Sequence, residues 1–168
     1  MLVPDDVEKR LAHYVETRNG EVVCPLGVGT QGTVFAIRVL SHPTEMAVKL
    51  HRRDVAYRRE LAVFLRLQEL EVSEVRGHEV PQLIGFDDEL LAIEMTIVSP
   101  PFCLDFGGAY LDQPPDYTPE VWRDWREQKS EDFEDDWPAV LEILGEFESF
   151  GIYIADVNPG NIRFQNNT

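Results

Sequence analysis

Apolar residues recur at intervals of three and four in several stretches of the chain, and this spacing places them on one face of an α-helix. The first stretch follows Asp5, which forms a capping pair with Glu8, and it ends at Asn19-Gly20. Before the second stretch, Asp54 can cap the helix that begins after it. The pattern therefore predicts helices at residues 6–17, 55–70, 119–130 and 132–150.

Other apolar runs are shorter and rich in β-branched residues, which favours strands. Turn-forming residues separate these runs, such as Ser41-His42-Pro43, and Ser99-Pro100-Pro101 ends the last one. The predicted strands lie at residues 21–26, 33–40, 45–51, 81–86 and 90–98. We therefore predict an α+β fold, in which a five-stranded antiparallel sheet with a helix precedes a smaller helical part.

The charge of the chain narrows the classes of partner. Its 168 residues fit a single domain, and their formal net charge is −16. This charge argues against binding nucleic acid or an anionic membrane through a general electrostatic surface. Much of the acidic excess lies between Asp112 and Glu148, which predicts a solvated acidic face; docking of a basic partner is the alternative.

The cysteines, the first residues and the length of the apolar runs bear on the cellular location of the protein. Cys24 and Cys103 are far apart and form no metal-binding spacing, so we expect reduced thiols. The first six residues do not resemble a secretory signal, and no apolar run reaches membrane-spanning length. These observations predict a cytoplasmic protein without a membrane segment.

Three glycines, Gly27, Gly29 and Gly32, stand in a G-x-G-x-x-G frame. Glycine has no Cβ, so the peptide N–H groups of such a segment can approach a phosphate closely. In a dinucleotide-binding turn the frame leads into a helix. Here a β-branched run follows, so we expect the glycines in a hairpin between two strands; an ordinary glycine turn is the alternative.

The next predicted strand contains Lys49 within an apolar run. A buried ammonium without a partner would be costly, so the run predicts either an ion pair or a lysine whose head group reaches water. Further along, Asp156-Val157-Asn158-Pro159-Gly160-Asn161 forms a polar loop after the last helix. Its Asn-Pro-Gly-Asn segment is also a good turn sequence in its own right.

In this order, the glycine hairpin, the strand lysine and the aspartate-to-asparagine loop resemble the protein-kinase-like superfamily. The resemblance implies an N-terminal helix at 1–20, a small lobe at 21–98 and a partial large lobe at 99–168. It also implies ATP and Mg²⁺ as ligands. Lys49 would hold the phosphates, Asp156 would be the base, and Asn161 would be the metal ligand.

The same resemblance assigns further nucleotide contacts. A glutamate on the helix after the strand would position Lys49; Glu60 is our choice and Glu69 competes with it, while Glu60 could instead balance Arg58 and Arg59. Around the adenine, the resemblance implies an apolar gatekeeper, two hinge backbone groups and an apolar roof. These are Ile93, the carbonyl of Glu94, the amide of Thr96, and the side chains of Val34 and Ala47.

The chain departs from the family in ways that concern catalysis. Ile154 and Ala155 stand where a histidine and an arginine are common, and no Asp-Phe-Gly follows Asn161. Asp105-Phe106-Gly107 spells that motif earlier in the chain, where we expect it to be coincidental and to lie outside the metal site. The alternative is that its loop folds back and supplies the second carboxylate.

The sequence therefore predicts an ATP–Mg-binding, kinase-like protein that transfers a phosphoryl group to an unknown protein or small-molecule acceptor. A catalytically inactive pseudokinase, acting as a nucleotide-binding or protein-interaction module, is the alternative. Retention of the lysine, aspartate and asparagine favours the enzyme, and loss of the second metal carboxylate favours the module. A third alternative is that the sequence is part of a longer kinase.

Overall fold

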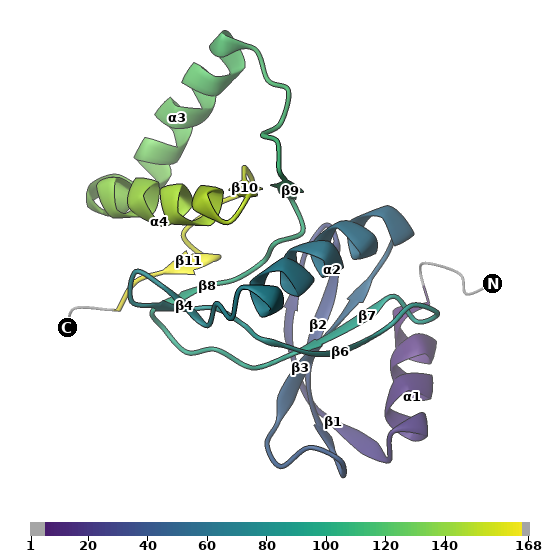
Figure 1. The fold of residues 1–168 in the computed structure, drawn as a ribbon. Coiled ribbons are helices and arrows are strands. Elements are labelled where there is room, and N and C mark those ends of the chain that lie inside the picture. Colours follow the sequence, from purple (N-terminus) through teal and green to yellow (C-terminus); the bar gives the residue numbers. More distant parts are fainter. Residues whose placement is uncertain (1–5, 166–168) are drawn as a thin grey trace. The chain divides into compact units, whose positions relative to one another are not determined.

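The computed structural model describes residues 6–165. The chain divides into two compact units, which are treated separately below (Figure 1). The first unit comprises the described part of Met1–Phe64 together with Pro81–Ile97. The second comprises Leu65–Val80 and the described part of Val98–Thr168.

A five-stranded sheet forms the centre of the first unit, and all of its neighbouring strands are antiparallel. The strands follow the order β1 (Gly20–Val28), β2 (Gly32–Val39), β3 (Met46–His51), β7 (Ala92–Met95) and β6 (Leu83–Asp87). The predicted α+β class and antiparallel sheet are confirmed. β7 is shorter than the predicted strand at 90–98, and β6 begins two residues later than expected.

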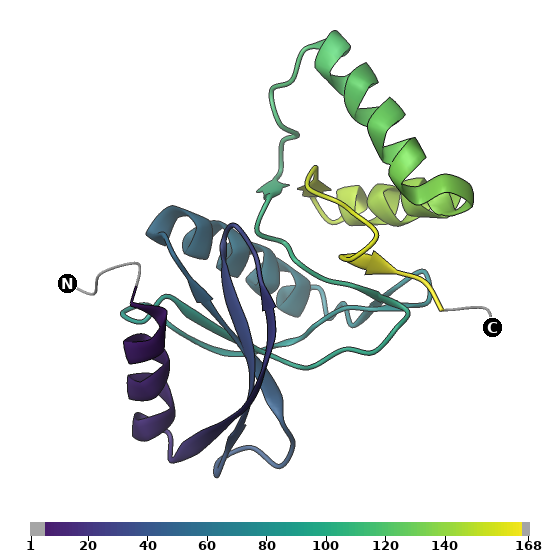
Figure 2. The same cartoon turned by 180° about the vertical axis from the view of Figure 1, so that it is seen from behind.

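Helix α1 (Val7–Thr17) packs its apolar side against the sheet, where Leu11 and Tyr14 join a buried cluster with Val48 and Leu50. Figure 2 shows this helix leading directly into β1. The helix was predicted at 6–17, but its cap is Asp6, whose carboxylate accepts a hydrogen bond from the N–H of Lys9 at 3.3 Å. The predicted cap, Asp5, lies outside the described residues.

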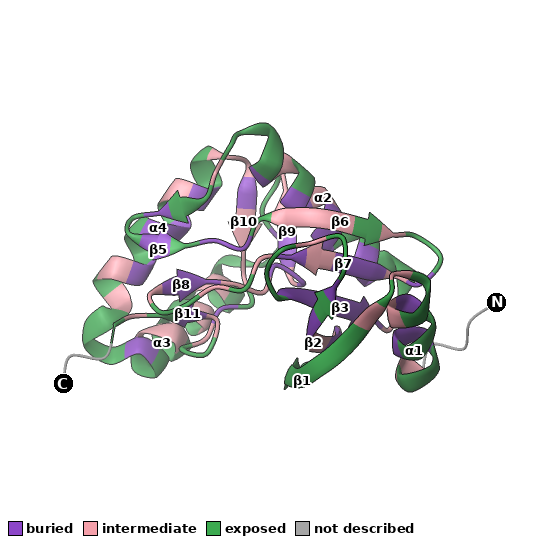
Figure 3. Ribbon diagram, turned by 90° about the horizontal axis from the view of Figure 1, so that it is seen from below, coloured by how far each residue is buried: buried purple, intermediate pink, exposed green. Residues whose placement is uncertain are grey.

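β3 is buried along its whole length, whereas β1 is mostly exposed (Figure 3). Side chains alternate between the two faces of a strand. Val48 and Leu50 face the cluster with α1, and Lys49 and His51 face the other side, where they meet Glu60 of α2 (Asp54–Glu69). Because both faces of β3 are covered, its sequence is mainly apolar, and its two polar residues, Lys49 and His51, are buried as well.

The second unit combines helices with short strands. Its helices are α3 (Pro119–Phe133) and α4 (Trp137–Ser149), joined by a 3₁₀ turn, η1 (Glu134–Asp136). Both helices were predicted, although the break between them is three to five residues later than expected. Apolar side chains of α4, among them Ile143 and Phe147, are buried in this unit.

Six strands of two or three residues complete the second unit, and none of them was predicted. A four-stranded sheet has the order β11 (Ile162–Arg163), β8 (Phe102–Cys103), β5 (His78–Glu79) and β4 (Glu74–Val75). The other pair joins β9 (Ala109–Leu111) and β10 (Ile152–Ile154). Runs this short carry no readable alternation, so only pairing reveals them. Across the described residues, no helix combines the length and apolar character needed to cross a membrane.

The close approach of β2 to β3 gives a first test. A Cβ on Gly32 would lie 2.4 Å from the carbonyl oxygen of Leu50, which is backbone and cannot turn away. We expect Gly32→Ala to lower the free energy of unfolding in urea by about 1–3 kcal/mol, as overpacking does. The matched control is Gly27→Ala, because no heavy atom lies within 4 Å of the Cβ it would add. Equal losses in both variants would contradict this account of the hairpin.

Candidate functional site

The glycine hairpin lies between β1 and β2, as predicted, and the amide of Gly29 donates to the carbonyl of Gly32 at 2.9 Å. Gly32 is required by the neighbouring strand, as described above. Gly27 and Gly29 are different: a Cβ on Gly27 would meet no heavy atom within 4 Å, and one on Gly29 would meet its nearest at 3.9 Å. Neither is among the described glycines with positive φ. The packing of the first unit therefore does not demand glycine at these two positions.

A buried ion pair follows on the next strand. The Nζ of Lys49 donates to Glu60, with its nitrogen 3.1 Å from Oε1 and 2.8 Å from Oε2. The side chains are 7% and 1% exposed, respectively. The competing candidate, Glu69, is exposed on the last turn of the same helix. The structure thus contains the predicted Lys49–Glu60 pair and excludes the interpretation that Glu60 only balances surface arginines.

His51 is the third member of this cluster, and the sequence analysis missed it. Its Nε2 lies 2.6 Å from Oε2 of Glu60, and its Nδ1 lies 3.2 Å from the carbonyl oxygen of Leu91. An ionised carboxylate and a carbonyl only accept hydrogen bonds, so this geometry places a proton on each ring nitrogen. Alternation could have revealed the contact, because His51 stands two residues after Lys49 and therefore on the same face of β3.

Glu60 is consequently held as an anion between the Lys49 ammonium and the His51 ring, both of which donate hydrogen bonds to it. Burial alone would raise the pKa of Glu60, but the charge of Lys49 and the hydrogen bond from His51 outweigh it and hold that pKa below its ordinary value. The cluster satisfies the general requirement that a buried charge be paired and hydrogen-bonded. It also fixes the Lys49 ammonium at one position beside the hairpin strand, since β2 pairs with β3 at Val34 and Lys49.

Helix α1 supports the same region from the other side of the sheet. The buried guanidinium of Arg10 donates from Nη1 to the carbonyl oxygens of His51, at 2.8 Å, and Leu90, at 2.9 Å. At the next turn, Tyr14 hydrogen-bonds the carboxylate of Glu94, and Arg18 pairs with that carboxylate at 3.0 Å. The helix therefore holds the ends of both β3 and β7.

The residues expected around an adenine are only partly arranged as predicted. Ile93 is buried opposite Lys49, and Ala47 is buried opposite Met95. The amide of Thr96, however, donates to the carbonyl of Gln82 at 2.9 Å, and its hydroxyl accepts from the Gln82 amide at 2.9 Å. This N–H is therefore occupied, because the pairing of β6 with β7 continues past the end of both strands. The prediction that it faces an adenine edge does not agree with this structure.

In the second unit, the loop from Asp156 to Asn161 connects β10 and β11. The side chain of Asn158 accepts from the amide of Gly160 at 2.8 Å, and its carbonyl accepts from the amide of Asn161 at 2.9 Å. Val157 is buried and anchors the loop, whereas Asp156 is exposed. The segment is thus a tight polar turn that displays the Asp156 carboxylate to solvent.

The segment containing Asp105 lies against this loop. The amide of Leu104 donates to the carbonyl of Asn161 at 2.8 Å, and a Cβ on Gly108 would lie 2.7 Å from the Cβ of Asp156. The short strands on either side, β8 with β11 and β9 with β10, hold the two segments together. Asp105 itself has a positive φ of 70° and accepts from the amide of Gly107 at 3.2 Å. This placement agrees with the alternative in which the loop of Asp105 folds back beside the loop of Asp156.

The oxygen donors around Asn161 in the second unit would suit a hard cation such as Mg²⁺ only together with the phosphates of a bound ligand. Within residues 6–165, no three His, Cys, Asp or Glu side chains are grouped so that they could hold a metal ion. Asp105, Asp156 and the amide of Asn161 provide oxygen donors on adjoining segments. Mg²⁺ commonly binds through one or two carboxylates together with substrate phosphates and water, and this smaller set fits that pattern.

Comparison with known protein families and curated proteins identified no relative of this chain. No protein-family model matches the chain, and no match was found among curated proteins.

The buried Glu60 carboxylate gives a testable dependence on pH. Glu60→Gln leaves Lys49 and His51 without their anion, so we expect a loss of about 3–5 kcal/mol in the free energy of unfolding at neutral pH. Because the folded-state pKa of Glu60 is lowered, its contribution is complete above its unfolded pKa, near 4.5, and is lost as pH falls through the folded value. The difference between wild type and Glu60→Gln should therefore shrink in acid.

Glu69→Gln is the matched control, since it makes the same substitution at an exposed position of the same helix. Urea denaturation of the three proteins across a series of pH values measures both effects. A constant difference between wild type and Glu60→Gln at every pH would contradict the assignment of Glu60 as the buried anion.

Proposed function

We propose that this chain is a kinase-like protein that binds ATP with Mg²⁺ and transfers the terminal phosphoryl group to an acceptor hydroxyl. The observation that carries the proposal is the buried Lys49–Glu60–His51 cluster on the strand that follows the glycine hairpin. Replacing a buried ion pair with apolar residues is often neutral or stabilising. A buried lysine at this position is therefore better explained by what its ammonium binds than by the stability it adds.

The hairpin supports the same proposal. Glycine weakens a strand by loss of backbone entropy and of side-chain packing. At Gly27 and Gly29 the unit offers no internal reason for that loss, because neither tight packing nor positive φ requires glycine. Close approach of a ligand phosphate to the backbone N–H groups is a sufficient external reason.

In the second unit, Asp156 is the proposed base. Its carboxylate is exposed and makes no hydrogen bond to the described residues, so an acceptor hydroxyl can reach it. It would take the hydroxyl proton while the acceptor oxygen bonds to the γ-phosphorus and the bond to the β–γ bridging oxygen breaks, leaving ADP. Mg²⁺, when bound with the nucleotide, would neutralise phosphate charge, and Asn161 and Asp105 are the residues that would hold it.

A nucleotide-binding module without catalysis is the second candidate. The observation that favours it is that no three His, Cys, Asp or Glu side chains within residues 6–165 are grouped so that they could hold a metal ion. The two candidates share the hairpin and the Lys49 cluster and differ only in what Asp156 and Asp105 do. They are therefore separated by activity rather than by binding.

Nucleotide binding is tested by thermal denaturation. ATP with Mg²⁺ at a hundred times its dissociation constant should stabilise the protein by about 2.7 kcal/mol, a shift of roughly 5–10 °C for a chain of this size. Lys49→Ala should remove most of the shift, and Lys9→Ala, at an exposed lysine, should keep it. Gly27→Ala should also weaken it with little loss of stability, since the added Cβ would meet no heavy atom within 4 Å. No shift with any nucleotide at millimolar concentration would overturn both candidates.

Catalysis is tested at the two aspartates. Asp156→Asn keeps the size of the side chain but cannot accept the proton, so we expect loss of ATPase or transferase activity with nucleotide affinity nearly unchanged. Asp105→Asn should weaken Mg²⁺ in the ternary complex about tenfold if it supplies the second carboxylate. Asp116→Asn, at an exposed position outside the loop, is the control. Activity that survives Asp156→Asn would remove Asp156 as the base.

A further inference from the structure

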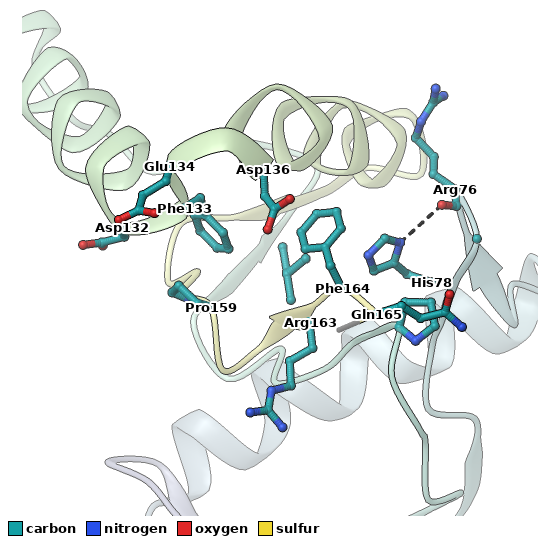
Figure 4. Close-up of a pocket in the computed structure, with 13 residues that line it drawn as sticks. Arg76, His78, Asp132, Phe133, Glu134, Asp136, Pro159, Arg163, Phe164 and Gln165 are labelled. Atoms are coloured by element: carbon teal, nitrogen blue, oxygen red, sulfur yellow. Dashed lines mark hydrogen bonds between the residues drawn. The ribbon is translucent and has the colours of Figure 1, made fainter. Parts of the chain in front are cut away.

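Two open cavities adjoin in the second unit, with volumes of about 910 and 670 Å³. They share the residues Arg76, Gly77, His78 and Phe164, so they meet at the ring of His78. Figure 4 shows the larger one, with acidic side chains and Phe133 on one side and Phe164 and His78 on the other. Pro159 of the Asp156 loop also lines this cavity, but the hairpin and the Lys49 cluster play no part in it.

His78 carries a buried nitrogen with an unmet hydrogen-bonding capacity. The residue is only 7% exposed, and its Nδ1 lies 3.2 Å from the carbonyl oxygen of Arg76. Since a carbonyl only accepts, this contact places a proton on Nδ1, and a ring with its proton on Nδ1 offers Nε2 as an acceptor. Nε2 has no hydrogen-bond partner among the described residues. Such buried polar atoms are rare in folded proteins, and an atom left unsatisfied calls for a donor that the protein itself does not provide.

The charges around the two cavities have one predominant sign. Asp132, Glu134 and Asp136 line the larger cavity, and Glu74, Glu142 and Glu146 line the smaller one. Asp132 is paired with Lys129 at 3.6 Å, and Glu142 with Arg76 at 2.9 Å.

The remaining four carboxylates form no ion pair with residues that the structure describes. Two arginines also line the larger cavity: Arg76, which pairs with Glu142, and Arg163, whose guanidinium Figure 4 shows directed away from Asp136. The lining therefore favours an occupant with more than one positive charge.

Aromatic rings form part of the same walls. The ring of Phe164 meets that of His78 edge-on, with centroids 4.7 Å apart, and Phe133 lines the opposite side. An ammonium group is attracted to such ring faces, and its alkyl stem packs against them. A phosphate or carboxylate ligand would instead face carboxylates without gaining these contacts.

We infer that these adjoining cavities bind an extended organic cation, in which alkylammonium groups pair with Asp136 and its neighbours and one N–H donates to Nε2 of His78. Because Nε2 is shielded from solvent, entry of the donor requires a neighbouring side chain to move aside. Two sources share this chemistry: a free polyamine, or a lysine-bearing segment of another protein. None of the residues that line the two cavities belongs to the hairpin or to the Lys49 cluster, so the inference does not rest on ATP binding.

Isothermal titration calorimetry with spermine, and with an acetylated and amidated tri-lysine peptide, tests the inference and separates its two sources. We expect saturable binding of one or both, weakened about tenfold by Asp136→Asn through loss of a charge partner. The matched control is Asp135→Asn, because Asp135 is exposed in the same 3₁₀ turn but lines neither cavity. The affinity of this control for spermine should lie within about twofold of wild type, because salt screens an exposed charge outside the cavities.

Equal weakening by Asp135→Asn and Asp136→Asn would show attraction by the general acidic surface and overturn the site. Binding of inorganic phosphate, lost in Arg163→Gln, would overturn the sign of the occupant. The histidine contact has its own readout: the ¹⁵N resonance of Nε2 of His78 should move on addition of spermine in wild type and in Asp135→Asn. An unmoved resonance at saturation would remove His78 from the site.

Discussion

The first unit depends on the buried interactions of the Glu60 carboxylate with Lys49 and His51. This carboxylate joins β3 to α2 through Lys49 and His51, and the ring of His51 reaches on to the carbonyl of Leu91. Arg10 of α1 then binds the backbone of the same histidine from the opposite side of the sheet. A single buried anion thus links a strand, the helix on one face and the helix on the other. Desolvation of this carboxylate costs free energy, which is offset because Lys49 and His51 lie within hydrogen-bonding distance of it.

The hairpin illustrates two separate demands that a protein can place on glycine. Gly32 is needed by the fold, since any side chain there would collide with the backbone of β3. Gly27 and Gly29 are needed by nothing within the unit, and they stand where a ligand can approach the backbone. One sequence frame therefore combines a structural glycine with two that function explains better than packing does.

The second unit holds its polar loops in place with very short strands. β8 and β9 flank Asp105, β10 and β11 flank the Asp156–Asn161 loop, and pairing at both ends brings the two segments together. The same unit places a buried, unsatisfied histidine nitrogen between two acid-lined cavities. Part of the acidic excess that is visible in the sequence therefore lies around these two cavities.

The sequence by itself determined the elements whose patterns are local and long: the helices, the principal strands, the hairpin and the glutamate that faces Lys49. The choice of Glu60 over Glu69 as the partner of Lys49 came from the resemblance to kinases, and the structure contains that pair. Only the tertiary structure decided that Asp105 lies beside Asp156, that the Thr96 amide is occupied by Gln82, and that His78 lacks a partner. Each of these depends on pairing between segments distant in the chain, and strands of two or three residues have no periodicity from which that pairing could be read.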